Sequence, residues 1–137
     1  MRKINLYFGL LLFLVFLISG YFLKEYFKPQ NINNLTIRME IRANHIYIIF
    51  ISFLNIISFK SELSQGKNWS TYLDKAFRIL LILSGTVAMY AFIFDHNGDL
   101  SGRKATLLSV VLSLAAIILF LVNELTYNFF KKNTLIS

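Results

Sequence analysis

The chain has 137 residues, of which 56% are hydrophobic and only 15% are charged, and its mean hydropathy is +0.59. A soluble domain of this length cannot hide so much apolar surface in one core. The absence of cysteine excludes disulfides, thiolate metal sites and cysteine catalysis. A net charge of +7 would suggest nucleic acid for a soluble protein, but here the basic residues lie in loops and at helix ends, where they meet anionic lipid head groups.

Four long apolar segments account for the high hydropathy. They cover approximately residues 4–23, 44–59, 73–94 and 106–125. Three of them reach the length of about 20 residues that crosses a hydrocarbon core, and the second is shorter. Backbone polar groups in lipid must be bonded within a helix or a closed barrel, and the alternation of barrel strands is absent. The sequence therefore predicts an all-α membrane protein, a single integral membrane domain over residues 1–137 with four transmembrane helices in an antiparallel bundle.

The first segment has the basic start of a signal peptide, because Arg2 and Lys3 precede its apolar run. The run is longer than the apolar region of a signal peptide, and no A-x-A-like cleavage site follows it. We therefore expect an uncleaved first helix. Residues 35–43 are expected to form a short interfacial helix that runs on into the second span.

Basic residues are nearly balanced between the two ends of the predicted bundle. The end that holds the N-terminus, the second connection and the C-terminal tail has Arg2, Lys3, Lys60, Lys67, Lys75, Arg78, Lys131 and Lys132. The other end has Lys24, Lys28, Arg38, Arg42, Arg103 and Lys104. This bias favours an inner (cytoplasmic) membrane protein with both termini in the cytoplasm, and its small size also fits insertion in both orientations.

Small residues line one face of each of the last two predicted helices. Close helix packing in lipid depends on such residues, which are Ser84, Ala88, Ala91, Ser109, Ser113 and Ala116. A hairpin folded about position 101 places Ala88 against Ser113, and Ser84 near Ala116. The packing of the third helix on the fourth is therefore expected to run along these six residues.

The same hairpin register places Arg78 opposite Glu124, the only acidic residue inside the fourth segment. A carboxylate at membrane depth is costly unless it is paired or near the interface. We therefore expect an interhelical ion pair between Arg78 and Glu124. The alternative is that Glu124 serves as a proton or cation site.

A polar stripe runs along the second predicted span. Asn44, His45, Ser52 and Asn55 fall within an arc of about 100° at helical spacing. A polar stripe in a spanning helix normally faces other helices or a cavity rather than lipid. This stripe is therefore expected to lie inside the bundle.

The two histidines, His45 and His96, are predicted near one membrane face. Two neutral imidazoles there can ligate a divalent metal or bracket a haem iron. The simpler interpretation, an interfacial or interhelical role with no cofactor, is the expectation, because two histidines without cysteine make a weak ligand set.

Three functions are compatible with the sequence. The expected one is a non-enzymatic accessory or self-associating membrane subunit, whose partners are the lipid bilayer and either a second copy or another membrane protein, with no nucleic acid. It follows from the small-residue faces and from the lack of a nucleophile elbow, a phosphate-binding glycine loop or paired carboxylates. The alternatives are a small channel or transporter lined by Ser52, Asn55, Ser84 and Thr86, and a haem or metal protein using His45 and His96.

Overall fold

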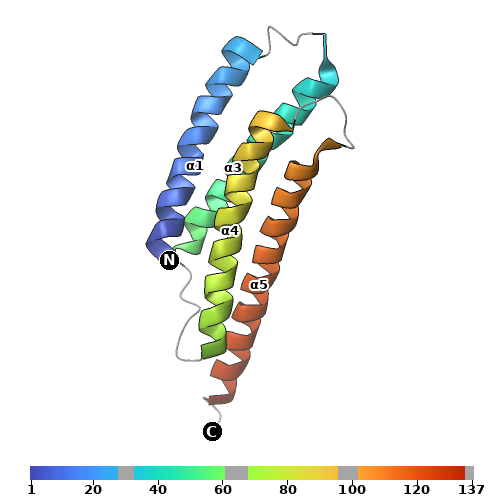
Figure 1. Ribbon diagram of the computed structural model, residues 1–137. Helices are drawn as coiled ribbons and strands as arrows, with labels where there is room; N and C mark the ends of the chain where they lie inside the picture. The colour runs from blue at the N-terminus through green and yellow to red at the C-terminus, as the bar shows by residue number, and fades with distance from the viewer. Residues whose placement is uncertain (28–32, 61–67, 96–101, 135–137) are drawn as a thin grey trace.

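The computed structural model describes residues 1–27, 33–60, 68–95 and 102–134 (Figure 1). Within these ranges the regular elements are helices: α1 (Arg2–Phe22), its π-helical continuation η1 (Leu23–Phe27), α3 (Leu35–Ser58), α4 (Asn68–Phe94) and α5 (Lys104–Thr134). The helix formed by α1 with η1, and each of the other three, is long and apolar enough to cross a membrane. The predicted all-α membrane fold with four spanning helices is confirmed.

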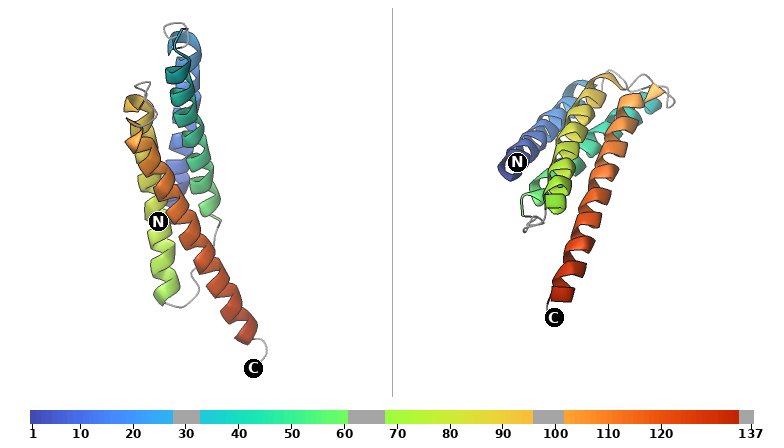
Figure 2. Two further views of the ribbon diagram at one scale, coloured as in Figure 1. Left: turned by 90° about the vertical axis from the view of Figure 1, so that its right-hand side faces the viewer. Right: turned by 60° about the horizontal axis from the view of Figure 1, so that its bottom comes forward.

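The helices form two antiparallel hairpins, α1 with α3 and α4 with α5, and α3 packs against α4 to join them. We call the end of the bundle where α1 and α4 begin the terminal end, and the end where α3 and α5 begin the far end. At the terminal end α4 and α5 extend beyond α1 and α3 (Figures 1 and 2). The hairpins are therefore offset along the bundle axis.

The second spanning helix is longer than its apolar segment suggested. It runs without a break from Leu35 to Ser58, so the expected interfacial helix continues into the span. Asn34 caps it, because its side-chain oxygen accepts a hydrogen bond from the backbone N–H of Ile37 at 3.1 Å. The first turns of α3 contain charged residues, so hydropathy alone does not include them in the apolar segment.

Two glycines let α1 approach its neighbours closely. A Cβ atom on Gly9 would lie 2.8 Å from Cγ1 of Ile56 on α3, and a Cβ atom on Gly85 of α4 would lie 2.7 Å from Cδ1 of Leu12 on α1. Small residues of this kind permit close contact where lipid provides no hydrophobic driving force. The position of α1 against α3 and α4 therefore depends on these two glycines.

Two apolar clusters fill the interior. One joins α1, α3 and α4 and contains Leu12, Ile48, Ile51 and Ala88. The other joins α4 and α5 and contains Phe77, Leu81 and Ala116. Polar contacts between helices lie around and beyond these clusters.

Candidate functional site

The polar stripe on α3 is directed at neighbouring helices. Asn44, Ser52 and Asn55 are each 1% exposed or less. The Ser52 hydroxyl, for example, donates to the carbonyl oxygen of Gly9 on α1 at 2.8 Å. Polar groups at membrane depth must be bonded inside the protein, so these three residues join helices. His45, the fourth member, has a different environment.

At the far end of the bundle the Asn44 side chain joins three helices. Its amide nitrogen donates to the carbonyl oxygens of Ala91 (2.9 Å) and Asp95 (3.1 Å) at the end of α4. Its oxygen accepts from the Thr106 hydroxyl (2.9 Å) and from the Arg103 guanidinium of the α5 region. The Asp95 carboxylate in turn accepts from the backbone N–H of Thr106 at 2.7 Å, near the start of α5. This network holds the far ends of α3, α4 and α5 together.

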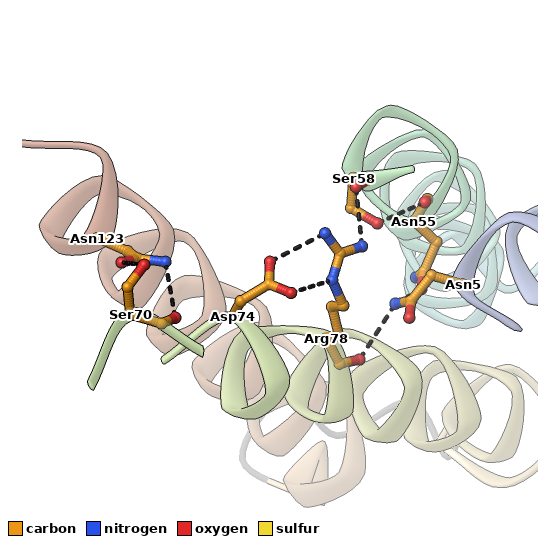
Figure 3. A network of polar contacts seen from close by, with 7 residues as sticks. All are labelled: Asn5, Asn55, Ser58, Ser70, Asp74, Arg78 and Asn123. Carbon is orange, nitrogen blue, oxygen red and sulfur yellow. Dashed lines mark hydrogen bonds and ion pairs between the residues drawn. The ribbon is translucent and has the colours of Figure 1, made fainter. Parts of the chain in front are cut away.

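At the terminal end a buried guanidinium joins α4 to α3 (Figure 3). Arg78 is fully buried, and its Nε and Nη2 atoms each donate to a carboxylate oxygen of Asp74 at 2.9 Å. Its Nη1 atom donates to the carbonyl oxygen of Ser58 at 2.8 Å. A buried charge is tolerated when it is both paired and hydrogen-bonded in this way. Among the described residues, the Nε, Nη1 and Nη2 atoms of Arg78 thus each donate a hydrogen bond to a partner.

Two asparagines extend the same network to α1 (Figure 3). The side-chain nitrogen of Asn5 donates to the side-chain oxygen of Asn55 at 2.9 Å and to the carbonyl oxygen of Arg78 at 3.2 Å. Asn55 also donates to the carbonyl oxygen of Leu81 at 3.4 Å. The terminal ends of α1, α3 and α4 are therefore held by side-chain amides.

The acidic partner that the structure shows for Arg78 is Asp74, one turn earlier on its own helix. Glu124 follows Asn123, whose side-chain oxygen accepts from the Ser70 hydroxyl at 2.9 Å (Figure 3). Ser70 and Arg78 are more than two turns apart, about 12 Å along the axis of α4. The observed register therefore does not set Glu124 opposite Arg78, and the ion pair between them stays a prediction.

The six small residues of α4 and α5 all lie buried, none more than 4% exposed. Their pairing differs from the expected one: Ser84 exchanges hydrogen bonds with Ser109 rather than lying near Ala116. Because α4 ends at Phe94 and α5 begins at Lys104, the chain does not turn symmetrically about position 101. Ser109 and Ala116 lie two turns apart on one face of α5, so the face expected from the sequence is kept while the register is displaced.

Of the two histidines predicted as ligands, the structure describes only His45. His45 is partly buried on α3, and His96 lies outside the described residues. Within the described ranges, no group of three or more His, Cys, Asp or Glu residues is placed to hold a metal ion. A metal or haem site at His45 and His96 therefore stays a prediction.

The His45 ring lies against α1 rather than in lipid. Its Nδ1 atom is 3.0 Å from the Ser19 hydroxyl oxygen, and its ring stacks on Phe16 with centroids 4.1 Å apart. A Cβ atom on Gly20 would lie 3.3 Å from Cε1 and 3.5 Å from Nε2 of the imidazole. The missing side chain at Gly20 therefore lets the other edge of the ring lie beside α1.

His45 and Gly20 both line a pocket of about 300 Å³ between the far ends of α1–η1 and α3. Eight residues line this pocket: Gly20, Leu23, Lys24 and Phe27 from α1–η1, and Arg38, Ile41, Arg42 and His45 from α3. Each set of four has the spacing i, i+3, i+4, i+7, which places its members on one face of a helix. Two facing helix stripes thus form the two walls.

The pocket is electropositive at its rim. Three of its eight lining residues are permanent cations, and none of these eight is acidic. The Lys24 ammonium lies 3.1 Å from the carboxylate of Glu25, which is not part of the lining, and both side chains are exposed. Along α3, His45 lies about 10 Å deeper in the span than Arg38. The arrangement suits an anionic group at the rim that is attached to an apolar body.

The sequence contained half of this site. Arg38, Arg42 and His45 have the spacing of a single helix face, and this spacing can be read from the sequence. The prediction used the two arginines only in the count of basic residues. The other wall could not be found in this way, because no local pattern states which face of α1 meets α3. Gly20 in particular has a role only once the imidazole lies beside it.

No family model matches the chain, and neither the curated proteins nor the solved structures include one that resembles it.

Proposed function

We propose that the protein is a non-enzymatic membrane protein that acts by association. We further propose that it binds the phosphate-bearing head group of an anionic lipid in the pocket between α1–η1 and α3, which we call the anion pocket. The observation that carries the proposal is the cluster of Lys24, Arg38 and Arg42 around one pocket at the end of two membrane spans. Basic pockets between transmembrane helices bind anionic head groups. Guanidinium groups suit this task because their planar donors match phosphate oxygens.

The surroundings of the pocket favour a lipid over a soluble anion. Leu23, Phe27 and Ile41 supply an apolar part of the lining. Beside the pocket, Tyr21 on α1 and Ile46 on α3 are more than 60% exposed, as expected of side chains that meet acyl chains. The pocket lies at the end of the spans, which is the depth of the head groups. A lipid can therefore place its phosphate at the rim while its chains remain in the bilayer.

The alternative of a channel receives less support, because the polar side chains that were expected to line it are bonded to the protein's own helices. Ser52, Asn55 and Ser84 donate to groups of neighbouring helices, and the exposed Thr86 hydroxyl donates to the Ile82 carbonyl of its own helix at 3.0 Å. A polar path would therefore require an assembly of several copies. Self-association, the identity of the membrane and the orientation of the termini stay predictions.

Native mass spectrometry of the full chain in mild detergent tests the proposal. Phosphatidylglycerol and phosphatidylcholine with identical acyl chains are titrated separately, and bound lipid is counted. We expect tighter binding of the anionic lipid, reduced about tenfold in Arg42→Gln because a charge-assisted hydrogen bond is lost. Lys104→Gln is the matched control, since Lys104 is an exposed cation at the start of α5, at the same end of the bundle, and lies outside the pocket. Equal binding of the two lipids, or equal losses in the two variants, contradicts the proposal.

A further inference from the structure

The contacts of Ser19 with His45 and with its own helix favour one position for the hydrogen of the imidazole ring. The Ser19 hydroxyl donates to the carbonyl oxygen of Phe16 in its own helix, at 3.0 Å. A hydroxyl has one hydrogen to donate, so its remaining contact, with Nδ1 of His45 at 3.0 Å, is one in which the oxygen accepts. With the Ser19 hydroxyl taken as the donor to its own helix, the hydrogen of the neutral imidazole is assigned to Nδ1.

This tautomer leaves the Nε2 atom with a lone pair. Nε2 belongs to the edge of the ring beside Gly20, and both residues line the anion pocket. The stacking of the ring on Phe16 and the bond to Ser19 hold that edge in place. The pocket therefore combines three cations at its rim with a fixed hydrogen-bond acceptor at its inner end.

The two classes of lipid phosphate differ in how they match these groups. A phosphodiester carries one negative charge and has no hydrogen on its phosphate oxygens. A phosphomonoester carries a charge of about −1.5 to −2 at pH 7, because its second pKa is near 6, and so retains a hydrogen part of the time. The monoester can donate that hydrogen to Nε2, or transfer it and accept a hydrogen bond from the resulting imidazolium. In either form its phosphate makes one bond at the inner end that the phosphate of a diester cannot make by giving up a hydrogen of its own.

We infer that the anion pocket selects a phosphomonoester lipid head group over a phosphodiester one, and that His45, held by Ser19, is the specificity-determining residue. The inference rests on the proposed function, since it names the class of lipid that the same pocket binds. The rim cations attract both classes of lipid, and the more highly charged monoester more strongly, whereas the hydrogen bond at the inner end forms with the monoester alone. The contribution of His45 to selectivity therefore adds to the difference in charge.

Parallel titrations with phosphatidic acid and phosphatidylmethanol of identical acyl chains test the selectivity, read as bound lipid by native mass spectrometry. Phosphatidylmethanol is a phosphodiester whose head group has no hydroxyl to donate to Nε2. We expect the unaltered chain to bind the monoester about tenfold more tightly. His45→Phe keeps a ring that can stack on Phe16, and should weaken monoester binding without changing diester binding, so that the ratio of the two affinities falls. Ser19→Ala keeps His45 but frees its tautomer, and should also reduce this ratio. Arg42→Gln should weaken both lipids, and the monoester somewhat more because it carries the larger charge.

The outcomes separate the two proposals. If both anionic lipids bind equally and Arg42→Gln weakens both, lipid binding stands and the selectivity is wrong. A ratio that survives unchanged in His45→Phe or in Ser19→Ala also overturns the selectivity. If neither lipid binds better than phosphatidylcholine, the proposed function itself fails.

Soluble phosphates distinguish the source of the monoester group. Inorganic phosphate and glycerol phosphate are added as competitors to the complex with phosphatidic acid. A lipid ligand predicts that neither displaces the lipid at comparable concentration, because neither has an apolar body for the pocket and the bilayer. Displacement at comparable concentration would overturn the assignment to a lipid and assign the pocket to a soluble phosphate.

Discussion

Ser84 and Ser109 exchange hydrogen bonds across the interface between α4 and α5. The Ser84 hydroxyl donates to the carbonyl oxygen of Ser109 at 2.9 Å, and the Ser109 hydroxyl donates to the carbonyl oxygen of Ser84 at 3.0 Å. Both residues are 1% exposed or less. The reciprocal bonds set the depth at which the two helices meet, because sliding either helix by one turn breaks both.

Each serine of this pair is expected to contribute a modest part of the stability. Interhelical hydrogen bonds in membrane proteins average about 0.6 kcal/mol, so Ser84→Ala and Ser109→Ala should each lower the free energy of unfolding by about that amount. The measurement is unfolding of the purified protein by titration with a denaturing detergent. Thr86→Ala is the control, because Thr86 bonds only to its own helix among the contacts described and is exposed, and it should change little. A loss as large in Thr86→Ala would contradict the assigned role of the pair.

The register of α4 against α5 can be tested by cross-linking, since the chain has no native cysteine. Ser84→Cys combined with Ser109→Cys should form a disulfide under mild oxidation, because the two hydroxyl oxygens lie 3.5 Å apart. Ser84→Cys combined with Ala116→Cys tests the register expected from a turn about position 101 and should remain reduced. Mass spectrometry of the linked peptides identifies the product. A disulfide in the second pair and none in the first would show that the helices slide.

Breaking the buried ion pair should be among the most damaging changes. Asp74→Ala leaves the fully buried guanidinium of Arg78 without the carboxylate that it contacts twice, and we expect a loss of about 3–5 kcal/mol in the free energy of unfolding. Replacing both partners, as Asp74→Leu with Arg78→Met, should recover most of the loss because no charge remains buried. Lys75→Ala, at an exposed neighbour, is the control. A double variant no more stable than Asp74→Ala would show that Arg78 has a further role.

The close approach of α1 to α3 depends on Gly9. A methyl group there would lie within 3.0 Å of side-chain and backbone atoms of α3, and backbone cannot rotate away. Gly9→Ala should therefore cost about 1–3 kcal/mol through overpacking, measured by thermal unfolding in detergent. Gly102→Ala is the matched control, because nothing lies within 4 Å of a Cβ atom at that position. An unchanged transition temperature in Gly9→Ala would mean that α1 is free to shift.

The sequence could predict whatever depends on local composition and on the helical period. Apolar runs of sufficient length predict spanning helices, because backbone groups in lipid have to be bonded within the helix. The stripe through Asn44, Ser52 and Asn55 predicts a buried face because polar side chains in lipid likewise have to be bonded within the protein. The structure places those side chains inside the bundle. The small residues of α4 and α5 likewise share buried faces.

What the sequence could not decide is how the helices are set against one another. Asp74 was not assigned to Arg78 from the sequence, although it lies one turn earlier on the same helix and its carboxylate contacts the guanidinium at 2.9 Å. The register of α4 against α5, shown by the contact of Ser70 with Asn123, also differs from the one expected. The pocket at the far ends of α1–η1 and α3 likewise exists because one face of each helix meets the other, and Gly20 matters only through that contact. Helix period and hydropathy are properties of neighbouring residues, whereas register and pockets arise from contacts between segments far apart in the chain. The sequence alone therefore determined four membrane-spanning helices and their polar faces, and the tertiary structure decided the pairing of those faces and the site that lies between them.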